Sequence, residues 1–221
     1  MNLYLFVLSF QIILTLNVHV LISSSLIIAA AMTFNSLLPA IETESKNESV
    51  NEPTEISIID FSTTSPAVWQ IVNDNVMGGV SRSRVDRHSE GFAVFSGTVS
   101  LRNNGGFASM RTQAQHPADL SGFEGLSVQV LGDGKVYSLR LKTVVNGRIT
   151  WYAFEASFAT VAGEWQTHHL SFSDFRPVYR GSAVRGNPVL NTDAVIELGF
   201  MIKEKQEGPF SLGIRSVNVY R

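Results

Sequence analysis

The stretch GDGKVYSLRLKTVVNGRITWYAFEASF, residues 132–158, decides the fold class of this chain. Within it, Tyr137, Leu139 and Leu141 alternate with polar side chains, and a second alternating run follows at 152–158. A period of two residues is typical of a strand that buries one face and exposes the other. Two such runs joined by a short polar connection predict paired antiparallel strands.

Glycine-containing turns separate runs of this kind elsewhere in the chain, as NNGG (103–106), GDG (132–134) and NG (146–147). Asn-Gly and Asp-Gly pairs tolerate the positive φ angles that tight hairpin turns require. We therefore expect each of these turns to close a β-hairpin. In the later stretch PFSLGIRSVNVY (209–220) the apolar residues change parity, which predicts a β-bulge near Arg215.

No segment after residue 56 shows an apolar helical stripe of about ten residues or more. Many short strands separated by turns favour two packed sheets over an open sheet. We predict an all-β fold, an antiparallel β-sandwich or jelly roll.

Three regions differ in composition. Residues 1–41 contain no Asp, Glu, Lys or Arg and are strongly apolar, so we expect a signal or membrane-anchor segment. Residues 42–55 contain five Glu and one Lys and read as an acidic disordered linker. Residues 56–221 have the size of one domain.

The location of the protein depends on how residues 1–41 are read. The three alanines at 29–31 suit a signal peptidase, which predicts an exported or membrane-anchored protein that meets the membrane only through this segment. The alternative is that the true start is near Met32, and the protein is then cytoplasmic or organellar.

Charge and composition exclude several function classes. Of the chain's 19 acidic and 17 basic residues, 14 and 16 lie in 56–221, a formal net charge of +2. This balance lacks the basic excess expected of a nucleic-acid-binding domain. The chain has no cysteine, which excludes disulfides, thiolate catalysis and cysteine-ligated metal sites.

The segment NDNVMGGVS, residues 73–81, holds three adjacent oxygen-bearing side chains, Asn73, Asp74 and Asn75. Calcium loops of the EF-hand type alternate their ligands and end in a glutamate, and this segment does neither. The Gly78-Gly79 pair also lacks the third glycine of a dinucleotide fingerprint. We therefore interpret the segment as a structural turn, with no metal and no cofactor, although loops also collect binding functions.

A second candidate surface lies on the solvent side of the strands in 132–158. Arg140, Lys142, Trp151 and Glu155 fall there by parity. Such a face could stack a sugar or dock a partner, and it could equally be a solvated face with cross-strand ion pairs.

An enzyme is the least favoured class. The sequence has no Gly-x-Ser-x-Gly nucleophile motif. Paired carboxylates for glycoside cleavage could still meet in space, as Asp74 with Glu155 or Asp133.

Five segments in this order resemble a known family, the complex I intermediate-associated proteins, which are assembly factors of NADH:ubiquinone oxidoreductase. They are WQIVNDNVMGGVS (69–81), FSGTVSLRNNGGFASMR (95–111), GDGKVYSLRL (132–141), GEWQTHHLSFSDFRPVYRG (163–181) and GPFSLGIRSVNVY (208–220). The resemblance covers essentially all of 56–221.

The resemblance implies a galactose-binding-domain-like β-sandwich that acts without catalysis and without a cofactor. Its implied partner is a protein client, such as an assembly intermediate of a membrane complex that the protein holds in the manner of a chaperone. Residues 1–41 lack the arginine-rich presequence of mitochondrial members. The alternative is a carbohydrate-binding module in which Trp151 and Tyr137 flank Arg140.

We expect a ligand or client to dock on the loops 73–81 and 103–107 and on the cationic, aromatic sheet face. The candidate binding residues are Asn73, Asp74, Asn75, Met77, Gly78, Gly79, Asn103, Asn104, Arg140 and Trp151.

Overall fold

The computed structural model describes residues 54–63 and 69–221, which belong to one compact unit. The predictions for residues 1–41 and for 42–53 lie outside the described residues. Glu55, the last residue of the predicted linker, is the first residue of strand β1. Within the described ranges, no helix has the length and apolar character needed to cross a bilayer.

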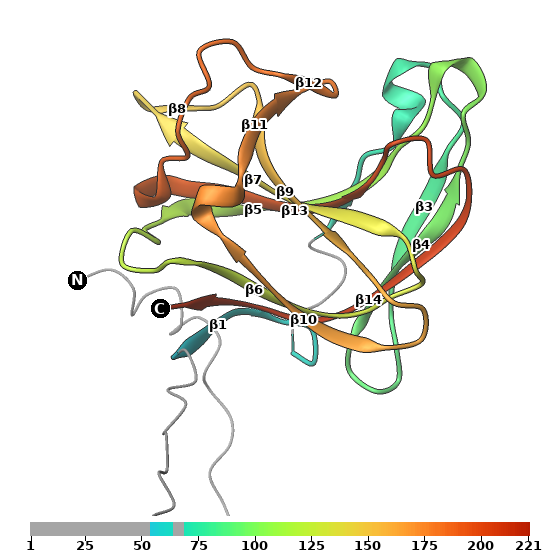
Figure 1. Cartoon of the computed structure of the whole chain (residues 1–221), viewed down its shortest axis with the longest axis horizontal. Coiled ribbons are helices and arrows are strands. Elements are labelled where there is room, and N and C mark those ends of the chain that lie inside the picture. The colour runs from blue at the N-terminus through green and yellow to red at the C-terminus, as the bar shows by residue number, and fades with distance from the viewer. Residues whose placement is uncertain (1–53, 64–68) are drawn as a thin grey trace, which may run out of the picture. The chain divides into compact units, whose positions relative to one another are not determined.

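Two antiparallel sheets lie face to face (Figure 1). Sheet A has six strands in the order β10-β6-β14-β4-β3, with β1 paired to β14. Its strands are β1 (Glu55–Asp60), β3 (Arg82–Arg87), β4 (Ala93–Val99), β6 (Gly125–Leu131), β10 (Trp165–Ser171) and β14 (Gly208–Tyr220).

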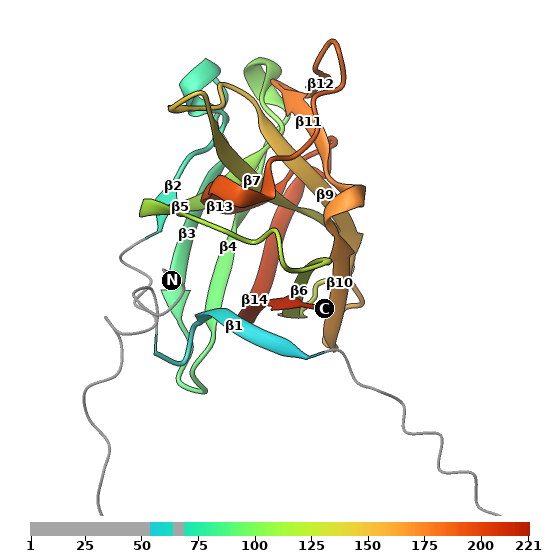
Figure 2. The ribbon, with the colours of Figure 1, turned by 90° about the vertical axis from the view of Figure 1, so that its left-hand side faces the viewer.

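Sheet B has eight strands in the order β12-β11-β9-β7-β13-β5-β2, with β8 paired to β7. Its strands are β2 (Gln70–Ile71), β5 (Ala108–Ala118), β7 (Val136–Val145), β8 (Arg148–Ile149), β9 (Ala153–Ala159), β11 (Arg176–Tyr179), β12 (Ser182–Ala183) and β13 (Val195–Ile202). In the view of Figure 2, β5, β13 and β7 lie above β1, β14 and β6.

The described residues contain no α-helix and four short 3-10 segments. These are η2 (Asp74–Met77), η3 (Arg102–Asn104), η4 (Phe172–Asp174) and η5 (Thr192–Ala194). The predicted all-β sandwich is confirmed.

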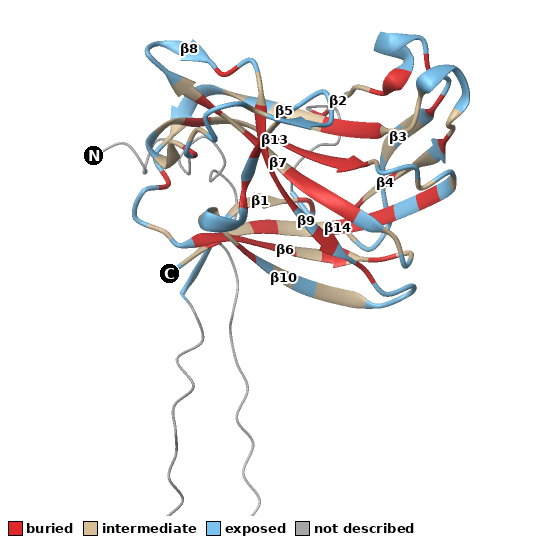
Figure 3. Cartoon of the chain, turned by 45° about the horizontal axis from the view of Figure 1, so that its top comes forward, coloured by how far each residue is buried: buried red, intermediate tan, exposed pale blue. Residues whose placement is uncertain are grey.

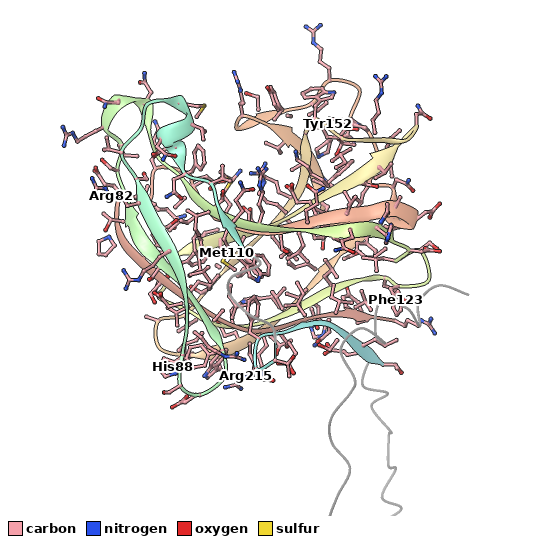
Figure 4. The ribbon with its side chains drawn as sticks, turned by 180° about the vertical axis from the view of Figure 1, so that it is seen from behind. Arg82, His88, Met110, Phe123, Tyr152 and Arg215 are labelled. Carbon is pink, nitrogen blue, oxygen red and sulfur yellow. The ribbon has the colours of Figure 1, made fainter. Side chains whose placement is uncertain are left out.

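The core forms between the sheets because their strands alternate apolar and polar residues. One inward row of sheet B places Met110 of β5, Phe200 of β13 and Leu139 of β7 side by side, all fully buried. Figure 4 shows Met110 between the two sheets. Figure 3 shows buried residues concentrated on the central strands and exposed residues on β8 and the loops around it.

The hairpin predictions need correction at two of three turns. Asn146 and Gly147 have positive φ and connect β7 to its partner β8, as a hairpin turn does. NNGG instead joins β4 of sheet A to β5 of sheet B, and GDG joins β6 of sheet A to β7 of sheet B. Glycine permits a tight change of direction, but it does not determine whether the next strand stays in the same sheet.

The predicted bulge is confirmed. The register between β14 and β6 shifts between Ile214 and Ser216, where the apolar residues of β14 change parity. The extra residue allows Ile214 and Val217 to be buried on the same face, at an odd spacing that a regular strand would place on opposite faces.

Candidate functional site

Asp74 is the centre of the first candidate site. Its side chain is 0% exposed. The backbone N–H of Ser81 donates to Oδ1 at 2.9 Å, and the N–H of Gly106 donates to Oδ2 at 2.7 Å. The Ser81 hydroxyl and the N–H of Phe107 also donate to Oδ2. One carboxylate therefore joins the β2–β3 connection to the β4–β5 connection.

Gly79 and Gly105 pack against the Asp74 carboxylate, which leaves no room for a larger residue at either position. A Cβ atom on Gly79 would overlap the Asp74 side chain, and a Cβ on Gly105 would lie 2.6 Å from Asp74 Oδ2. Real Cβ atoms do not approach so closely. One glycine of the GG pair (78–79) and one of NNGG (103–106) thus leave room for the Asp74 side chain.

Electrostatics favour the charged form of Asp74. Burial raises the pKa of this carboxyl, but the hydrogen bonds from Ser81, Gly106 and Phe107 together outweigh burial and hold the pKa below its usual value. All four donors are neutral groups on these residues, so the charge is stabilised by dipoles. The charged carboxylate of Asp74 therefore serves to hold the two connections together.

Asn73 extends the same network. Its side-chain oxygen accepts hydrogen bonds from the Ser83 hydroxyl at 2.7 Å and from the Ser109 N–H at 3.4 Å. These contacts attach the start of the segment to β3 and β5. The turn role expected for 73–81 agrees with this geometry.

The far side of the segment faces solvent and forms what we call the apolar tip, residues Val76, Met77 and Val80. Val76 is 68% exposed and Met77 is 50% exposed, although both are apolar. Gly78 follows with φ of 90°, a conformation that suits glycine and ends η2. Exposed apolar side chains on a rigidly held turn are suited to contact with another molecule.

The other predicted residues divide between this tip and sheet B. Asn75 is exposed beside the tip, and Asn103 and Asn104 are exposed on the adjoining β4–β5 connection with positive φ. Arg140 and Trp151 belong to a different part of the surface, over β7 and before β9. In Figure 1 the coil of η2 stands above β3 and β4, whereas β8 and β11 stand at the opposite side.

The outward side of sheet B carries what we call the charged face. Strand register places one row of residues across it in the order Gln70, Arg111, Gly199, Arg140, Glu155, Arg176. A neighbouring row pairs Glu197 with Lys142. Lys203, which follows β13, also contacts this face through Glu155.

Glu155 is the buried anion of this face, at 8% exposed. Lys203 Nζ donates a hydrogen bond to its Oε1, and Arg140 Nε lies 3.6 Å from its Oε2. Arg111 and Glu197 form a second pair at 3.6 Å. The cross-strand ion pairs considered for Arg140 and Glu155 are thus present.

The positive charge of the Arg140 guanidinium is poorly compensated by its neighbours. Burial lowers the pKa of its guanidinium, Glu155 and Glu197 oppose that change, and Arg111 adds to it. Its Nη1 donates to the Met201 sulfur at 3.3 Å, a weak acceptor, and its buried Nε has no hydrogen-bond partner among the described residues.

Trp151 stands at the edge of sheet B in an aromatic group. It is 62% exposed, and its ring meets the rings of Tyr179 at 4.8 Å and Tyr152 at 5.0 Å, both edge-on. Tyr137, expected beside it in the carbohydrate hypothesis, is instead fully buried with its hydroxyl bonded to Asp133. The parity of Tyr137 with Leu139 and Leu141 already placed it in the core.

The carboxylates considered as an acid pair have separate partners. Asp74 accepts from Ser81 and the glycine loop, Glu155 from Lys203, and Asp133 from Tyr137 and the Ser211 N–H. In the part of the chain that the structure describes, no three His, Cys, Asp or Glu side chains are grouped to hold a metal ion.

Sequence reasoning missed several contributors to these surfaces. They are Arg111, Tyr179, Gly199 and Lys203. Val76, Val80, Ser81, Gly105 and Gly106 lie within the predicted loops 73–81 and 103–107, although they were not named individually. Strand register across sheet B was needed to find Arg111 and Gly199, and the contact with Glu155 was needed to find Lys203, since all three are distant from Arg140 in sequence.

Comparison with known proteins agrees with the sequence motifs. A family model described as Complex I intermediate-associated protein 30 (CIA30) matches residues 59–214. A Caenorhabditis briggsae protein named "Probable complex I intermediate-associated protein 30, mitochondrial" is 26% identical over 170 residues, covering 69% of this chain and 50% of the relative. An uncharacterized protein of Schizosaccharomyces pombe is 26% identical over 166 residues, 67% of this chain and 76% of the relative.

Solved structures support the fold. A family 11 carbohydrate-binding module from Clostridium thermocellum, in complex with a β-1,3-1,4-mixed-linked tetrasaccharide, aligns with a TM-score of 0.56 and 17% identity. The alignment covers 75% of this chain and 94% of that module. A family 30 carbohydrate-binding module from the same organism aligns with a TM-score of 0.51 and 15% identity, over 75% and 96%.

Proposed function

Because this chain belongs to the complex I intermediate-associated protein 30 family, we propose that it is a non-catalytic binding module that holds a protein client. The proposed client is an assembly intermediate of a membrane complex of the NADH:ubiquinone oxidoreductase type. The chain spans about half the length of the Caenorhabditis relative, so the proposal concerns the shared domain.

The observation that carries the proposal is the apolar tip. Val76, Met77 and Val80 are exposed, yet the turn that presents them is fixed by the buried Asp74 carboxylate. A preorganised apolar contact loses little conformational entropy when it binds, which favours affinity. Such a surface suits a protein partner better than a small polar ligand.

The proposed client also implies a location for the protein in the cell. Relatives named mitochondrial support an organellar location. Export or anchoring through residues 1–41 is the competing proposal, and fractionation of the native host into organelles, membranes and secreted material distinguishes the two.

The test compares the full-length tagged chain with Val76→Ser/Met77→Ser in the native host. We expect the unaltered chain to co-purify with identified subunits of NADH:ubiquinone oxidoreductase, and the double variant to retain about tenfold less of them. Val189→Ser is the matched control, since it removes an exposed valine far along the sequence from the tip. Equal capture by the double variant, at an unchanged melting temperature, would exclude the tip as the docking site.

A carbohydrate-binding role is the second candidate, favoured by the exposed Trp151 beside Tyr179. Aromatic rings at the edge of a sheet give a sugar ring an apolar surface to stack on. Calorimetric titration with a mixed-linked β-glucan oligosaccharide checks this role. Binding that falls about tenfold in Trp151→Ala supports it, and heats equal to dilution at millimolar sugar refute it.

A further inference from the structure

One buried hydrogen-bond donor of the charged face, on Arg140, has no acceptor among the described residues. A guanidinium has five N–H donors and no acceptor of its own. In Arg140, the Nε donor is buried without a partner among the described residues, and Nη1 reaches the Met201 sulfur. Glu155 lies 3.6 Å from Nε, beyond hydrogen-bond distance, and its other oxygen is held by Lys203.

A second guanidinium lies in the same row, and a glycine separates the two. Gly199 pairs with Arg111 on one side and with Arg140 on the other. A Cβ on Gly199 would lie 2.7 Å from the Met110 carbonyl oxygen, so close packing of the strands keeps this position free of a side chain. The two arginines therefore flank a position that has no side chain of its own.

The cations outnumber the carboxylates on this face. Strand register and contacts place Arg111, Arg140, Lys142, Arg176 and Lys203 there against Glu155 and Glu197. Lys203 also pairs with the exposed Glu204 at 3.5 Å. The face thus has unsatisfied positive charge, although the described domain as a whole is nearly neutral.

We propose that the charged face binds an acidic peptide segment, whose carboxylates accept hydrogen bonds from the guanidinium groups of Arg140 and Arg111. The Nε of Arg111 donates to Gln70 Oε1 at 3.2 Å and its Nη1 lies 3.6 Å from Glu197, so the remaining N–H groups of Arg111 are the ones a peptide would meet. Guanidinium groups match carboxylates because two parallel N–H bonds can meet the two oxygens. The central row contains no aromatic residue, so it offers a sugar ring no surface to stack on. This site is separate from the apolar tip and does not require it.

The experiment measures binding of a fluorescein-labelled octaglutamate peptide to the purified full-length protein, with octaglutamine as the uncharged control. We expect octaglutamate to bind and octaglutamine not to bind. We also expect each of Arg140→Gln and Arg111→Gln to weaken octaglutamate binding about tenfold. Arg111→Gln should leave the melting temperature unchanged, whereas Arg140→Gln removes a partner of the buried Glu155, so its binding is measured at a temperature at which circular dichroism shows the variant to be folded. Arg84→Gln is the control, since it removes the same charge from the exposed β3 strand of sheet A.

Three results would overturn the proposal. Equal binding of the two peptides would show that carboxylates are not recognised. An equal loss in Arg84→Gln would show that net charge alone is responsible. Tighter binding of an oligogalacturonate would assign the face to an acidic glycan. Loss of client capture in the tip variant with octaglutamate binding intact would separate the two surfaces, so either proposal can fail alone.

Discussion

The carboxylate of Asp74 is out of contact with water, yet its pKa is lowered, because four donors from Ser81, Gly106 and Phe107 converge on it. An unfolded chain cannot assemble these donors, since they come from two segments about thirty residues apart in sequence. The charge of one residue is therefore coupled to the folding of two loops.

Asp74→Asn tests this coupling. The amide must turn its NH2 group toward backbone N–H donors, so we expect the free energy of unfolding at pH 7 to fall by about 2–3 kcal/mol. The Asp74 contribution is complete above the unfolded pKa of about 3.9 and is lost as the pH falls through the lower folded value. Urea unfolding should therefore show the gap between the two proteins narrowing in acid. A gap that is the same at pH 7 and in acid contradicts this role, and Asp86→Asn, at an exposed site, is the control.

Gly78 and Gly79 are adjacent, but glycine is needed at each position for a different reason. Gly79→Ala would overlap the Asp74 side chain, and we expect a loss of about 2–3 kcal/mol from overpacking. Gly78 has positive φ and open space around it, so Gly78→Ala should cost about 1 kcal/mol through backbone strain alone. Thermal unfolding of both variants checks the order, and a larger loss at Gly78 would refute the packing account.

At the scale of strands, sheet B stabilises Glu155 from two neighbouring strands. Lys203 follows β13 and Arg140 lies in β7, and both contact the buried carboxylate. Lys203→Met leaves Glu155 with the longer Arg140 contact, so we expect stability to fall by about 2–3 kcal/mol. Urea unfolding at pH 7 measures the loss. Lys203→Arg, which keeps the positive charge beside Glu155, should retain most of the stability, and an equal loss in Lys203→Arg would mean that the charge pair is not the cause.

The strands could be predicted because their information is local. Alternation in 137–141 predicts which face of β7 is buried, and the parity change near Arg215 predicts the bulge in β14. The sheet to which each strand belongs could not be predicted. NNGG and GDG have the chemistry of hairpin turns, yet each passes between sheets, because partner choice depends on contacts distant in sequence.

The candidate site, like the strands, could be predicted only where the information is local in sequence. The turn character of 73–81 follows from its own residues, and Asn73 and Asp74 were identified with it. Their partners Ser109 and Gly106 lie more than thirty positions away, as the separations of 36 and 32 residues show. Parity assigned Arg140, Lys142 and Glu155 to the charged face, but Arg111 could be added only once register had placed it in one row with Arg140.

At the scale of the whole molecule, the domain should depend on β1 but not on the residues before it. β1 pairs with β14 along its length, and Phe61 beyond it is 1% exposed. We expect a chain that begins at Thr54 to melt within about 2 °C of the full chain. A chain that begins at Thr63 should lose about 3 kcal/mol or more, since it lacks a strand and a buried aromatic side chain. Scanning calorimetry compares the three, and equal melting of the shortest chain would refute a structural role for β1.

The position of β14 in the strand order has a consequence for synthesis in the cell. β14 follows every other strand in the chain, yet it pairs with β1, β4 and β6 and so lies within sheet A. A ribosome that has made β1 to β13 has therefore produced sheet A without the strand that connects its two halves. We expect the nascent domain to expose apolar surface until β14 emerges, which leaves time for holdase chaperones to bind it or for a translocation channel to thread it.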